Sequence, residues 1–199
     1  MVNQSVINKV ALLLLDYIVE LPATIRQLAS EDADAMFNKS PHGLSTRELV
    51  SEISGLQGKG LIYIEGDNGA SFRLHEGDDV SGEILDLKVC LSAAGGKLWE
   101  SAFKPDWNRF LSVDMEITDS GSEVFRLGAL NKALLEEIRE QLRKLAEVHH
   151  IEGVTSWRAT YWKQFERGYQ LEFSVKKLEI DSLLVKSRKQ WCLDWSGLG

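Results

Sequence analysis

The stretch LSTRELVSEISGLQGKGLIYIEG, residues 44–66, decides the fold of the first half of this chain. Ser45 precedes Glu48 by three residues, the spacing of a capping box, in which each side chain satisfies an unpaired amide at a helix start. Apolar residues then recur at helical spacing, a glycine ends the helix, and an apolar strand follows at residues 61–65. The apolar face comprises Leu49, Ile53 and Leu56, and the terminating glycine is Gly58 or Gly60.

A second strand is expected at residues 70–75, joined to the first across a Gly-Asp-Asn-Gly turn. Upstream, apolar periodicity predicts one helix over residues 5–19 and another from Pro22 to Phe37. Helices followed by a capped third helix and a hairpin resemble the winged-helix superfamily. The resemblance implies that the third helix could read DNA, with the hairpin as its wing.

The second half has a different pattern. Alternating residues predict strands over 111–117 and 123–127, a long apolar stripe predicts a helix over 129–149, and a hairpin is expected over 155–163 and 169–177. We therefore expect an α+β protein with a winged-helix-like module at residues 1–104 and a ββαββ module at residues 105–199. Pro105 marks the boundary because proline ends a helix, and residues 178–199 fit either a helix or a strand.

The string LSAAGGKLWESAFKPDWNRF, residues 91–110, spans this boundary. A doubled glycine precedes Trp-Glu and then Pro-Asp-Trp. The string resembles a segment of uncharacterised bacterial proteins to which no activity is attached, so it indicates a bacterial origin and no function.

Composition narrows the class of protein. The chain holds 23 Lys and Arg against 30 Asp and Glu, and residues 1–103 alone hold 8 against 15, so the whole excess of −7 lies in the first half. No apolar run reaches the roughly 20 residues of a membrane span. Cys90 and Cys192 lie far apart without metal-ligand spacing. We expect an acidic cytoplasmic protein with reduced thiols, no metal or cofactor, and no membrane partner.

DNA binding is the first alternative that the winged-helix resemblance raises. The contacts would come from Arg47, Lys59 and Arg73. Phosphate neutralisation needs a basic surface, but Glu48 and Glu52 share the helix with Arg47. The acidic first module therefore disfavours a nucleic-acid partner.

The string WRATYWKQFERGY, residues 157–169, interleaves aromatic and basic residues. Such a string can stack on single-stranded nucleic acid, but Trp and Arg also dominate protein interfaces, and strand alternation would place one aromatic set in the core. We favour a protein interface combined with core packing. The candidate surface residues are Trp99, Trp107, Arg158, Trp162, Lys163 and Arg167.

An enzyme has less support in the sequence. The common phosphate-loop, dinucleotide, zinc-protease and serine-hydrolase motifs are absent, and the His149-His150 pair is expected to stabilise the end of the long helix. We expect a non-enzymatic protein-binding or regulatory factor, of immunity type or an adaptor, with no catalytic residue. The alternatives are a winged-helix DNA-binding transcriptional regulator and an enzyme of unknown class.

Overall fold

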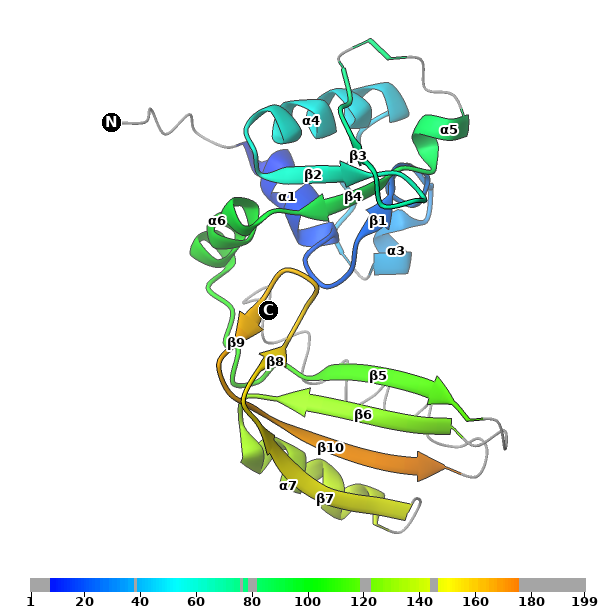
Figure 1. The fold of residues 1–199 in the computed structure, drawn as a ribbon. Coiled ribbons are helices and arrows are strands. Elements are labelled where there is room, and N and C mark those ends of the chain that lie inside the picture. Colours follow the sequence, from blue (N-terminus) through cyan, green and yellow to red (C-terminus); the bar gives the residue numbers. More distant parts are fainter. Residues whose placement is uncertain are drawn as a thin grey trace. The chain divides into compact units, whose positions relative to one another are not determined.

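The computed structural model describes residues 8–37, 39–75, 77–78, 82–118, 123–143 and 147–175. It combines helices with antiparallel sheets, which confirms the α+β class (Figure 1). The chain divides into two compact units, Met1–Ala102 and Phe103–Gly199, called unit 1 and unit 2 here. Cys192 and the predicted elements after residue 175 lie outside the described residues. Within the described ranges, no helix is long and apolar enough to cross a membrane.

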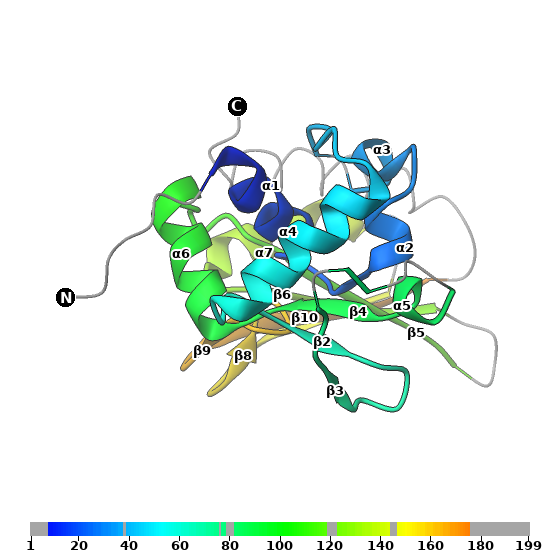
Figure 2. The ribbon, with the colours of Figure 1, turned by 90° about the horizontal axis from the view of Figure 1, so that it is seen from above.

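Unit 1 contains an antiparallel sheet with the strand order β1-β4-β2-β3. Helix α4 packs against β2 and crosses above it in Figure 2. The core is formed by apolar side chains of both the helices and the sheet, among them Leu15, Leu49 and Ile64 at 0% exposure. The elements are α1 (Lys9–Tyr17), β1 (Ala23–Thr24), α2 (Ile25–Leu28), α3 (Ala33–Phe37), α4 (Thr46–Gly58), β2 (Ile62–Glu65), β3 (Ser71–Phe72), α5 (Gly82–Leu85), β4 (Lys88–Leu91) and α6 (Ala93–Phe103).

Helix α4 has both ends that the sequence predicts. At its start the Ser45 side chain accepts a hydrogen bond from the Glu48 amide, while the Glu48 carboxylate accepts one from the Ser45 amide at 2.8 Å. At its end Gly60 adopts a φ of 70°, and the amides of Gly60 and Leu61 donate to the carbonyls of Gln57 and Leu56. This is the Schellman arrangement that favours glycine, and it turns the chain directly into β2.

The prediction of a single helix from Pro22 to Phe37 is wrong. The chain instead forms β1, α2 and α3. Thr24 starts a new helix because it forms a second capping box with Gln27, and β1 pairs with β4. The apolar residues of the stretch ILDLKVC, residues 84–90, would also fit a single strand, but the stretch divides between α5 and β4.

Gly95, the first of the doubled glycines in the 91–110 string, allows helix α6 to approach the main chain of Leu61, directly before β2. The Ser92 hydroxyl accepts from the Gly95 amide and donates to the Gly60 carbonyl at 2.7 Å. A Cβ on Gly95 would lie 2.0 Å from the Leu61 carbonyl oxygen. Only glycine fits this contact, so the motif has a packing role.

Asp16 and Trp99 join α1 to α6 inside unit 1. Both residues are 0% exposed, and the Trp99 indole donates to Oδ1 of Asp16 at 2.7 Å. The other oxygen, Oδ2, lies 2.9 Å from the Lys39 ammonium in an ion pair that lacks hydrogen-bond geometry. A buried carboxylate needs such partners because desolvation disfavours its charge. Trp99 therefore belongs to the core, and its predicted place on an interaction surface is wrong.

Unit 2 is built on an antiparallel sheet with the strand order β5-β6-β10-β7. Helix α7 covers one face, as Figure 1 shows, and its apolar side chains Leu135, Ile138 and Leu142 pack there with Phe125 and Leu171. The opposite face is called the outer face here. The elements are β5 (Ser112–Ile117), β6 (Glu123–Ala129), α7 (Lys132–Leu142), β7 (Glu147–Val154), β8 (Trp157–Arg158), β9 (Gln164–Phe165) and β10 (Gly168–Val175).

Two element predictions in unit 2 are wrong. The long helix ends at Leu142, so His149 and His150 lie in strand β7 and stabilise no helix end. The strand predicted over residues 155–163 breaks after Arg158, because the amides of Ala159 and Thr160 both donate to the Lys163 carbonyl and close a turn. The short strands β8 and β9 pair only with each other among the described strands, while β10 pairs with β6 and β7.

Loss of the Lys39 ammonium should destabilise unit 1. We expect Lys39→Met to lower the free energy of unfolding by about 3 kcal/mol, because removing one partner leaves a buried charge uncompensated. Hydrogen exchange of unit 1 amides under urea measures this change. Lys97→Met, at an exposed position of α6, is the matched control. Adding Asp16→Asn to Lys39→Met should recover part of the loss, and a failure to recover would contradict the charge explanation.

The glycine requirement can be tested with a pair of alanine substitutions. Gly95→Ala should cost about 2 kcal/mol, because the new methyl group overlaps backbone. Gly55→Ala, at a site in α4 with nothing within 4 Å of the new Cβ, should stabilise by up to about 1 kcal/mol through helix propensity. Thermal denaturation compares the two. Equal effects would show that the contact with Leu61 is unimportant.

Candidate binding site

The residues 157–165, called the aromatic arm here, lie over one end of the outer face. Strand alternation turns Leu127 and Ala129 toward α7, so Gly128 faces outward. The indole N–H of Trp157 donates to the Ser112 hydroxyl at 3.3 Å beside this glycine. Trp157 is only 2% exposed, so it anchors the arm to the sheet.

Two glycines make room for Trp157. A Cβ on Gly128 would lie 2.2 Å from its indole nitrogen, and a Cβ on Gly168 would lie 2.5 Å from its Cβ. Any larger residue at either position would displace the ring. The arm can lie here because Gly128 on β6 and Gly168 on β10 carry no Cβ.

Aromatic rings extend from this anchor toward the surface. Phe165 stacks on Trp157 with centroids 5.6 Å apart and an interplanar angle of 17°. Trp107 meets Phe165 at 5.6 Å, Phe110 at 5.3 Å and Trp162 at 6.1 Å, each with its ring steeply inclined. Such edge-to-face contacts match the negative face of one ring with the positive edge of another. The rings form one continuous cluster.

The Lys163 ammonium lies among three of these rings. Its Nζ is 5.1 Å from the centroid of Phe165, 5.5 Å from that of Trp107 and 5.9 Å from that of Trp162. Each distance is within the range of a cation–π interaction. Lys163 and its three ring neighbours are half-buried. This set of three rings around the ammonium is called the lysine box here.

Local turns position the walls of the box. Trp107 follows Asp106, whose carboxylate accepts from the Asn108 amide at 3.1 Å and fixes a turn, so Asp106 has the turn role that its residue type allows. The Lys163 amide donates to the Thr160 hydroxyl at 3.2 Å, which fixes the main chain beneath the ammonium.

The structure thus brings together Trp107, Trp162 and Lys163 from the predicted surface. Arg158, in β8, and Arg167, directly before β10, are both exposed. Phe165 was missing from the predicted set, although it belongs to the same aromatic and basic string and is two residues from Lys163. Sequence reasoning could therefore have found Phe165, but not its contact with Trp107.

Neither a protein-family model, nor a curated protein, nor a solved structure matches this chain. The winged-helix resemblance stays a prediction, and function must be argued from the described side chains.

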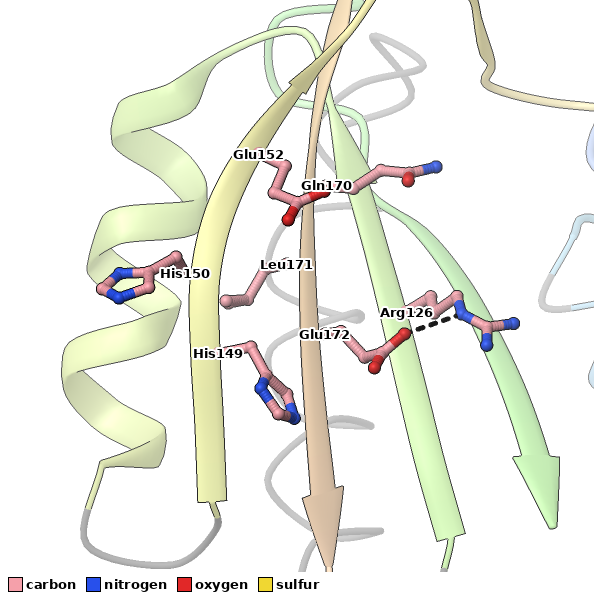
Figure 3. Close-up of a pocket in the computed structure, with 7 residues that line it drawn as sticks. All are labelled: Arg126, His149, His150, Glu152, Gln170, Leu171 and Glu172. Carbon is pink, nitrogen blue, oxygen red and sulfur yellow. Dashed lines mark hydrogen bonds and ion pairs between the residues drawn. The ribbon is translucent and has the colours of Figure 1, made fainter. Parts of the chain in front are cut away.

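A hollow of about 220 Å³ lies elsewhere on the outer face (Figure 3). It is smaller than most ligand pockets, which span about 300–1,000 Å³. The guanidinium of Arg126 contacts Glu172 at 2.9 Å and Glu116 at 3.1 Å, and these carboxylates raise the pKa of Arg126. His150 points to the far side of β7 from Glu172 in Figure 3. The lining residues are Arg126, His149, His150, Glu152, Gln170, Leu171 and Glu172.

The ionisable groups of this hollow do not converge on one point, and no group of three His, Cys, Asp or Glu side chains in the described ranges could hold a metal. The buried thiol of Cys90, in unit 1, is no better suited to chemistry. Burial and then the neighbouring Glu65 raise its pKa to about 11, which disfavours the nucleophilic thiolate.

Two of the three candidate DNA contacts, Arg47 and Lys59, lie at opposite ends of α4. Arg47 lies in the first turn of α4, Lys59 at its C-terminal cap and Arg73 just after β3; all three are exposed. About 18 Å of helix separates Arg47 from Lys59 at 1.5 Å per residue. Moreover, Gln57 and Ser54 of α4 donate to the carbonyls of Phe72 and Leu74. These polar side chains hold β3 and the residues directly after it against α4.

The contact between Trp157 and Gly168 should control the geometry of the box. Gly168→Ala should cost about 1–3 kcal/mol through overpacking and should move the Trp157 indole N–H signal in a ¹H–¹⁵N spectrum. Gly153→Ala, whose new Cβ would come no closer than 4.0 Å to the Tyr169 ring, should leave that signal in place. An unmoved signal in Gly168→Ala would mean that the arm is positioned by other contacts.

Proposed function

We propose that this protein is a non-enzymatic protein-binding or regulatory factor, of immunity type or an adaptor, which binds its partner through the lysine box and the exposed Arg158 and Arg167 of the same unit. The observation that carries the proposal is the half-buried cluster of Trp107, Trp162 and Phe165 around Lys163. Trp, Tyr and Arg are the residues in which binding energy is most concentrated at protein interfaces.

Two rings of the cluster are held in place by buried neighbours, which suits a binding surface. Rigid aromatic side chains give large contact area at a low entropic cost on binding, because they are already fixed before the partner arrives. Phe165 is fixed by the buried ring of Trp157, and Trp107 by Phe110. Arg158 and Arg167 are exposed and can supply the polar rim that surrounds such an anchor.

The charge distribution favours a basic partner. Unit 1 carries 8 Lys and Arg against 15 Asp and Glu, and an acidic surface speeds encounters with a positively charged protein. Some charged side chains of unit 1 form ion pairs with one another, such as Arg26 with Asp86 at 2.8 Å. The excess of acidic residues remains after these pairs are discounted. We favour this function over DNA binding because the same charge repels phosphate.

Site-specific photo-crosslinking in the native cell tests the proposal. A benzophenone amino acid at position 162 should form an adduct with one protein, whereas the same amino acid at position 137, exposed on α7, should not. Trp162→Ala should then weaken the isolated complex by roughly tenfold or more, since hot-spot truncations typically cost about 2 kcal/mol. Equal labelling at both positions, or no adduct at 162, would refute a partner at the box.

A further inference from the structure

The lysine box has the geometry of a cation receptor. Three aromatic rings lie within 5.1–5.9 Å of a single ammonium nitrogen, and Trp107 is inclined by 69° to Trp162 and by 66° to Phe165. The rings therefore present walls in different planes to one positive charge. Boxes of this type recognise quaternary ammonium groups, because the ring faces carry partial negative charge.

Two walls of the box are held in place without the lysine. Phe165 stacks on Trp157, which is 2% exposed and bounded by Gly128 and Gly168. Trp107 packs against Phe110, which is 3% exposed. These contacts do not involve the ammonium, so its departure would leave Phe165 and Trp107 supported.

Lys163 can leave the box without unfolding the arm. Its carbonyl accepts from the amides of Ala159 and Thr160, and its own amide donates to the Thr160 hydroxyl. Its flexible side chain can rotate while these backbone hydrogen bonds stay in place, and an exposed lysine regains rotamer freedom. A primary ammonium is strongly hydrated, which lowers the cost of moving it from the rings into water.

We propose that the lysine box is a receptor for an N-methylated ammonium group, and that Lys163 is an internal ligand which such a group displaces. Methyl groups remove hydrogen-bond donors from the cation, so a trimethylated ammonium loses less hydration than Lys163 on entering the box. The group could come from a small molecule or from a trimethylated lysine of a protein. The second source rests on the proposed function, because it makes the box part of the partner interface.

Titration of the full chain with tetramethylammonium tests the receptor, with the tryptophan indole N–H signals as the readout. We expect saturable shifts of the Trp107 and Trp162 signals. A neutral analogue, 3,3-dimethylbutan-1-ol, should not produce them, because its tert-butyl group matches the shape of a trimethylammonium head without the charge. Absence of saturation, or equal shifts with the analogue, would overturn the proposal.

Two variants test the role of Lys163 separately from that of the aromatic rings. Lys163→Ala should tighten tetramethylammonium binding about fivefold to tenfold, the equivalent of losing a competing cation–π contact. Trp162→Leu should weaken it at least tenfold while the Trp157 indole signal stays in place, which verifies that the arm is folded. Unchanged affinity in Lys163→Ala would refute the internal ligand, and unchanged affinity in Trp162→Leu would refute the box.

A short peptide with a single trimethyl-lysine distinguishes the two sources. Binding at least tenfold tighter than that of tetramethylammonium indicates a protein ligand, and equal affinity indicates a small molecule; both support the receptor. If position 162 crosslinks to a partner but neither probe binds, this inference fails and the proposed function stands. If the probes bind and no partner is crosslinked, the proposed function fails and the receptor stands.

Discussion

The position of the aromatic arm in unit 2 depends on the close packing of Trp157 against Gly128 and Gly168. The ring occupies space that a Cβ at either glycine would fill, so the aromatic arm can lie over the end of the sheet. Phe165 stacks on Trp157, Trp107 meets Phe165, and Lys163 lies among the outer rings. The close packing of Trp157 on the sheet therefore helps to determine where the half-buried Lys163 and its neighbouring rings lie.

Unit 1 uses the same device for a different purpose. Gly95 lets α6 approach the Leu61 carbonyl, and α6 then delivers the Trp99 indole to the buried carboxylate of Asp16. The conspicuous Gly-Gly and Trp of this segment thus serve the core. Polar side chains of α4 are likewise engaged inside unit 1, where Gln57 and Ser54 donate to the carbonyls of Phe72 and Leu74.

The hollow around Arg126 and the lysine box differ in what they can recognise. Around Arg126 the charges neutralise one another on an open surface, where exposed ion pairs contribute little. In the lysine box a cation faces aromatic rings that remain attractive to any cation of suitable size. The arrangement of walls around Lys163, more than the number of charged groups, makes the box the better candidate for binding.

The sequence by itself determined the α+β class and helix α4 with both of its ends, and its residue types marked Trp107, Trp162 and Lys163 as candidates. These features depend on capping, periodicity and residue type, which act over a few positions. Tertiary structure alone decided that Trp99 is buried and that Trp107 meets Phe165, because such contacts join distant segments. It also decided that residues 159–163 turn back, since a few backbone hydrogen bonds there override strand alternation.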